Sequence, residues 1–115
     1  MKVMDYTIKS KLWIEANGNI ILGEGRTRLL KAIDNEGSLS AAAKSLGMSY
    51  KKAWKLVDVV NKNAKQPVVL TSTGGSGGGG AEVTSYGKEL IRQFEALKAD
   101  CWKHLKSSEE KLKNL

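Results

Sequence analysis

Lysine side chains are concentrated in one short stretch of this chain. Of the net charge of +7 carried by the 115 residues, +5 falls within residues 44–66, where Asp58 is the one acidic residue. The six lysines of this stretch are Lys44, Lys51, Lys52, Lys55, Lys62 and Lys65. Clustered cations bind a polyanion by releasing the counterions condensed on it. Phosphate binding is therefore the chemistry we expect, although a solvated lysine-rich helix would have the same composition.

The remaining reactive side chains do not form a catalytic or metal-binding set. The one histidine, His104, lies far along the chain from any glycine-framed serine, so no nucleophile is paired with a base. Cys, His and carboxylates nowhere have the spacing of metal ligands. The glycine run at 74–80 lacks the Gly-Lys-Ser/Thr of a phosphate-binding P-loop. We therefore expect no enzyme, no metal and no cofactor.

Length and composition are those of a small globular protein. A chain of 115 residues is one domain, with room for an appendage. Hydrophobic residues make up 41% and charged residues 27%, which is ordinary for a globular fold. No apolar run approaches the ~18 residues of a membrane span, and the single Cys101 fits a reducing compartment. We expect a cytoplasmic location and no membrane partner.

A helix over residues 50–63 would gather the lysines on one side. Ser49 is the expected N-cap, because its hydroxyl can accept from the free amides of the first turn. On a helical wheel Lys51, Lys55 and Lys62 fall within about 40° of one another. The apolar side chains lie opposite, which makes the helix amphipathic. Tyr50 and Trp54 flank the two faces; we expect Trp54 in the core and leave Tyr50 open between core and ligand contact.

Two elements are predicted before a short helix. Asn17-Gly18 lies between apolar stretches and predicts a β-hairpin over 8–22, since both residues tolerate positive φ. A helix is expected over 25–36, ended by Gly37. Ser38 or Ser40 then caps the short, alanine-rich helix that Gly47 ends.

A second hairpin and a long helix are predicted after the lysine-rich helix. Strands are expected at 68–73 and 81–84, on either side of the glycine run. Leucines and other apolar residues then recur at helical spacing, so a helix of about 38 Å should cover 86–110. This length exceeds what so small a domain can cover. Its overhanging apolar stripe would be buried against a second copy, or else the helix folds back on its own core.

The order of these elements predicts the fold class. It is mainly α with a small β component: a winged helix-turn-helix with an N-terminal β-hairpin and a long C-terminal dimerisation helix. Residues 1–85 would form the DNA-binding domain and residues 86–115 the dimerisation element. In this architecture the third helix enters the major groove of double-stranded DNA.

Four segments of the chain resemble the DNA-binding domain of ModE-type molybdate-responsive regulators, which are related to the N-terminal domains of LysR-type regulators. These are GEGRTRLLKAID at 23–34, GSLSAAAKSLGMSYKKAW at 37–54, GGSGGGGA at 74–81 and VTSYGKELI at 83–91. The resemblance implies that Ser49, Tyr50, Lys51 and Lys52 read DNA. It also implies a homodimer formed partly through the long helix. Two third helices in successive major grooves would then bind a pseudo-palindromic site.

Further contacts are predicted around that motif. Lys55 would anchor a phosphate, and the candidates beyond the third helix are Ser40, Lys44, Ser76 and Gly77. The family wing usually has an acidic-basic pair before its glycines and a basic residue among them, whereas Leu70, Thr71 and Ser76 occupy those places here. Residues 67–87 contain no Lys or Arg, so we expect the third helix to supply the affinity.

Two other functions fit the same residues. The chain would be a protein-interaction module if the fold were kept without strong DNA binding, or a small-oxyanion sensor if the glycine loop bound molybdate or tungstate. The molybdate-binding modules that follow in full-length family members are not found in these 115 residues, so molybdate sensing is not expected of them. The operator, the sign of regulation and the effector are not predicted.

Overall fold

The computed structural model describes residues 2, 4–72 and 79–115, and its elements follow the predicted order. They are β1 (Ile14–Ala16), β2 (Asn19–Leu22), α1 (Glu24–Glu36), α2 (Leu39–Ser45), α3 (Tyr50–Asn63), β3 (Val69–Ser72), β4 (Gly80–Val83) and α4 (Ser85–Lys113). The strands form two antiparallel pairs, β1 with β2 and β3 with β4. The predicted fold class, mainly helical with small hairpins and a long C-terminal helix, is confirmed.

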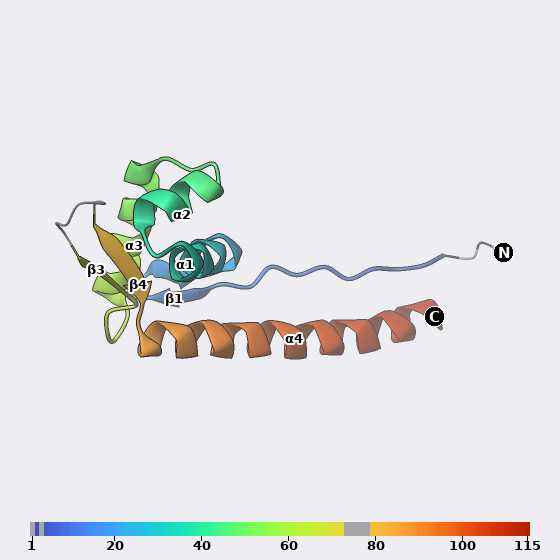
Figure 1. Cartoon of the computed structure of the whole chain (residues 1–115). Helices are drawn as coiled ribbons and strands as arrows, with labels where there is room; N and C mark the ends of the chain where they lie inside the picture. The colour runs from blue at the N-terminus through green and yellow to red at the C-terminus, as the bar shows by residue number, and fades with distance from the viewer. Residues whose placement is uncertain (1, 3, 73–78) are drawn as a thin grey trace.

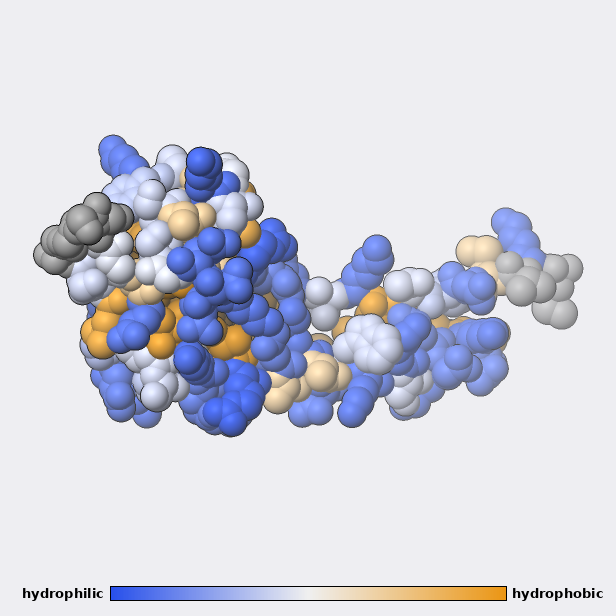
Figure 2. Space-filling view, in the orientation of Figure 1, coloured by the Kyte–Doolittle hydropathy of each residue, from blue (hydrophilic) through white to orange (hydrophobic). Residues whose placement is uncertain are grey.

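The molecule has a body and a long projection. Helices α1, α2 and α3 and the two hairpins form the body, and α4 runs out from it beside the N-terminal segment (Figure 1). The principal extents are 68 × 28 × 22 Å. On the face shown in Figure 2, apolar side chains gather on the body, whereas the projection is largely hydrophilic.

One apolar core holds the body together. Its largest fully buried side chains come from β2, α1, α3, the start of the second hairpin and α4; they are Leu22, Leu29, Leu30, Ile33, Val60, Val68 and Phe94. Burying a side chain of this size contributes about 1.5–3 kcal/mol. The long helix is therefore anchored in the same core that supports α3.

The N-terminal hairpin is shorter than predicted. Its strands begin at Ile14, not at Ile8, and residues 8–13 run extended beside α4, where the Ile8 amide donates to Glu109 Oε2 at 2.8 Å. The predicted start was wrong because the two-residue turn at Asn17-Gly18 leaves only Asn19–Leu22 for pairing before α1 begins. Residues before 14 have no partner strand left.

Side-chain caps and a glycine turn set the angle between α2 and α3. Ser38, and not Ser40, caps α2, with its hydroxyl accepting from the Ala41 amide at 3.1 Å. Gly47 has φ +66°, a conformation that glycine adopts without strain. Ser49 then caps α3 as predicted, accepting from the Lys52 amide at 3.1 Å. The chain is thus turned sharply between the two helices.

The second hairpin is fastened to two helices. Asn61 on α3 accepts from the amides of Val68 and Val69 at 2.8 and 3.1 Å, and donates to the Val69 carbonyl at 2.9 Å. On the other strand, the Ala81 amide donates to the carbonyl of Gly37 at 2.9 Å. The strands therefore hold a fixed position relative to both α1 and α3.

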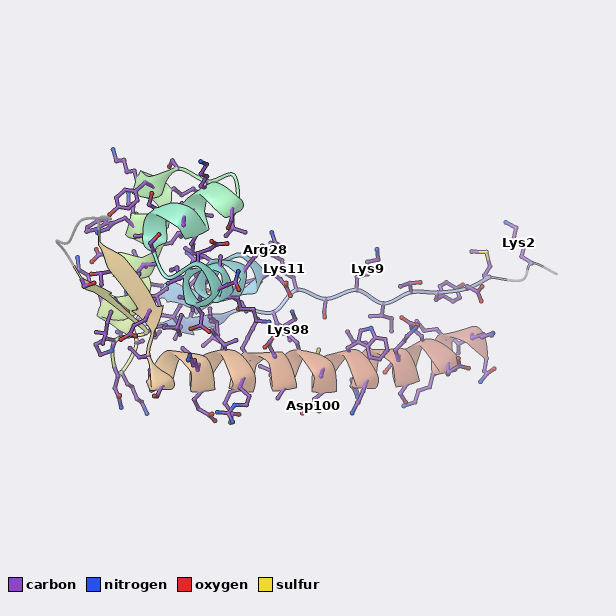
Figure 3. All side chains as sticks on the ribbon, in the orientation of Figure 1. Lys2, Lys9, Lys11, Arg28, Lys98 and Asp100 are labelled. Carbon is purple, nitrogen blue, oxygen red and sulfur yellow. The ribbon has the colours of Figure 1, made fainter. Side chains whose placement is uncertain are left out.

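Ion pairs add to the apolar anchoring of α4. Its lysines Lys88 and Lys98 pair with Asp34 and Glu24 on α1. The hydrogen bond from Lys98, together with its positive charge, lowers the pKa of Glu24 below its usual value. Figure 3 shows Lys98 pointing toward the body while Asp100 points away on the opposite side of the helix. One face of the first half of α4 is therefore the docking face.

Gly87 marks the closest approach of α4 to the second hairpin, and Gly87→Ala should destabilise the fold. A Cβ there would lie 2.6 Å from the Val68 carbonyl oxygen and 2.8 Å from Val83 Cγ1. Overpacking of this kind costs about 1–3 kcal/mol of unfolding free energy, measured by urea denaturation. Gly25→Ala, where nothing lies within 4 Å, is the control and should raise that free energy by about 0.5 kcal/mol. Equal effects would contradict the close approach.

Candidate nucleic-acid interface

Helix α3 presents a cationic face away from the body. Ala53, Val57 and Val60 are buried in the core, as the wheel predicts. Lys51, Lys52 and Lys55 are exposed on the other side, in the first two turns of the helix. Because the cap at Ser49 and the buried ridge fix the rotation of the helix, the direction of these lysines is fixed too.

Most of the positive charge in this region is not neutralised by the protein. Lys62, in the last turn of α3, pairs with Asp58 at 2.9 Å. Within residues 2, 4–72 and 79–115, the ion pairs involve none of the other lysines of the stretch 44–66. These are Lys44, Lys51, Lys52, Lys55 and Lys65. An uncompensated cluster of this kind produces a field that attracts an anionic partner.

The other predicted contacts lie around the start of α3. Ser49 and Tyr50 are exposed at its N-terminal end, and Ser40 and Lys44 are exposed on α2. The hydroxyl of Ser49 is engaged as the helix cap, but it retains a proton to donate. Ser76 and Gly77 lie outside the residues that the structure describes. The structure thus brings Ser40 beside the start of α3, where Ser40 and Tyr50 line one cleft.

Trp54 is not a core residue, which corrects the prediction. Its side chain is 52% exposed, and Tyr50, one turn earlier, is 57% exposed. On the wheel Trp54 lies about 60° from Lys51, while Ala53 and Val57 occupy the core side. The aromatic residue type favoured burial, and its angular position, about 60° from Lys51 and about 60° from the buried Val57, did not decide between the two faces.

Trp54 and Tyr50 form one side of a cleft between α3 and the second hairpin. The cleft has a volume of about 290 Å³. Its other lining residues come from the start of α2 and from the strands; they are Leu39, Ser40, Thr71, Ser72, Gly79 and Gly80. None of the described residues that line the cleft is charged, so an uncharged surface lies beside the lysine face of α3.

Two negative findings apply to the described residues 2, 4–72 and 79–115. No three His, Cys, Asp or Glu side chains are placed to hold one metal ion. No helix combines the length and apolar character that crossing a bilayer requires.

The chain is similar to curated bacterial proteins, although no family model matches it. The molybdenum transport protein ModE of Azotobacter vinelandii is 35% identical over 103 residues, which cover 90% of this chain and 38% of that protein. The molybdenum-pterin-binding protein MopB of Rhodobacter capsulatus is 44% identical over 79% of this chain and 34% of its own length. The DNA-binding transcriptional dual regulator ModE of Escherichia coli K12 is 44% identical over 72 residues, which cover 63% of this chain and 28% of that protein. The chain spans about a third of the length of the curated relatives it matches.

Proposed function

We propose, on the premise that the chain belongs to the ModE-type DNA-binding domains, that it is a cytoplasmic transcriptional regulator that binds double-stranded DNA as a homodimer. The observation that carries the proposal is the set of lysines Lys51, Lys52 and Lys55 on the exposed face of α3, which form no ion pair with any residue that the structure describes. The relatives are named as regulators and molybdenum-related binding proteins, which favours a regulatory role over a catalytic one.

The proposed binding mode places α3 in the major groove, whose width of about 12 Å admits one helix. Ser49 and Tyr50, at the leading end, would meet base edges. Lys51 and Lys52 would contact bases or the flanking phosphates, and Lys55 would bind phosphate. Ser40 and Lys44 on α2, with Ser76 and Gly77 on the glycine wing, remain proposed contacts to the DNA backbone.

The part of α4 that follows Phe94 supports the homodimer. Beyond the anchoring residue Phe94, its side chains Leu97, Trp102 and Leu112 are exposed. A helix that projects with apolar residues exposed can bury them against the same helix of a second copy. Two α3 helices related in this way would enter successive major grooves, about 34 Å apart.

Selection of bound duplexes from a random pool tests the whole proposal. We expect enrichment of two inverted half-sites whose centres lie about 10–11 base pairs apart. No enrichment, together with tight binding to another protein, would contradict the proposal and favour an interaction module.

A further inference from the structure

Two large aromatic side chains are exposed on the side of the body where α3 carries its lysines. Tyr50 and Trp54 are four residues apart on α3, so they lie on one face of the helix. Each is more than half exposed, although an aromatic side chain of this kind buries about 150–250 Å² when it is covered. Neither side chain is needed in the core, which α3 supplies with Ala53, Val57 and Val60.

The cleft behind these rings suits an uncharged group with one polar neighbour. Its lining residues include Trp54, Tyr50 and Leu39, which have apolar or aromatic side chains, and Ser40, Thr71 and Ser72, which have hydroxyls. The phosphate-binding lysines Lys51 and Lys55 point to the neighbouring face of α3, about 60–100° around the helix from Trp54. We therefore expect the cleft to receive a part of the DNA other than its phosphates.

On the base edges of the major groove, the apolar group is the 5-methyl of thymine, which stands beside the O4 acceptor. We propose that Trp54, with Tyr50, forms a specificity subsite that receives the methyl group of one thymine in each half-site. Hydroxyls on the cleft wall can donate to O4 of the same base. The inference rests on the proposed function, and it names the base that α3 selects.

Deoxyuridine scanning tests the subsite, because uracil differs from thymine only by the methyl group. With the selected duplex, each thymine of the half-site is replaced in turn. Wild-type affinity should fall about fourfold at one position, the value of one buried methyl. The Trp54→Ala variant should bind the thymine duplex more weakly and lose its sensitivity to uracil at that position. Trp54→Leu, which keeps an apolar side chain, should retain part of the sensitivity.

Trp13→Ala is the matched control, since Trp13 is a 48% exposed tryptophan just before β1 that does not line this cleft. It should leave the response to uracil unchanged, and thermal unfolding of both alanine variants should confirm that they are folded. The subsite would be overturned, with DNA binding left intact, if Trp54→Ala kept the sensitivity to uracil. It would also be overturned if Trp54→Ala lost the same affinity for every duplex sequence. A selected half-site that contains no thymine would also overturn the subsite and leave DNA binding intact. A wild-type protein that binds no duplex would overturn the proposed function and the subsite together.

Discussion

Replacing both Lys51 and Lys55 by glutamate should abolish specific duplex binding, with a loss of affinity of more than about a hundredfold near physiological salt. Both lysines are exposed in the first two turns of α3 and neither has an ion-pair partner within residues 2, 4–72 and 79–115. In each protomer, the exchange removes two phosphate contacts and introduces two repulsive charges at the same places. Fluorescence anisotropy with the selected duplex measures the loss.

The corresponding double alanine variant measures the number of contacts. Each lost phosphate contact should reduce the steepness of log K against log salt by about 0.9, so the loss of two contacts in each protomer of the bound dimer should reduce it by about 3.6. The control for the glutamate exchange is Lys9→Glu with Lys11→Glu, two exposed lysines of the N-terminal segment that give the same change in net charge as Lys51→Glu with Lys55→Glu. An equal loss in this control would show that the total charge, and not the face of α3, determines binding.

Phe94→Ala should lower the free energy of unfolding by about 3–5 kcal/mol, the largest stability effect that we expect from one substitution. Phe94 is 1% exposed and is the largest of the fully buried side chains. Its removal leaves a cavity where α4 meets the body, so both the core and the attachment of the long helix are weakened.

Chemical denaturation monitored by circular dichroism measures this effect. Gln93→Ala is the control, because it shortens an exposed side chain on the same turn of α4. We expect it to change the free energy of unfolding by no more than about 0.5 kcal/mol. A similar effect of the two substitutions would contradict the anchoring of α4 through Phe94.

Local signals in the sequence were sufficient for α3. Its predicted range, 50–63, matches Tyr50–Asn63, because the cap at Ser49 and the apolar period are both properties of neighbouring residues. The start of the first hairpin was not predictable in the same way. Whether residues 8–13 pair depends on the length of the partner strand, which is set by where α1 begins.

The candidate site was likewise predictable only in part. The lysine face follows from charge and helical spacing, which involve one element. The cleft beside it joins α3 to Leu39 on α2 and to Thr71 on β3, and residues this far apart in sequence meet only in the folded chain. The exposure of Trp54 was not predictable from the sequence either, because its aromatic side chain favoured the core and only the folded chain leaves it exposed.

The three hydrogen bonds of Asn61 make α3 and the root of the second hairpin one unit. A surface assembled in advance loses little conformational entropy when its partner arrives. Association should therefore be a single bimolecular phase without a slow isomerisation, accelerated by the field of the lysines. For α3 and the root of the hairpin, the heat-capacity change should then correspond to the contact area, without an added contribution from folding on the target.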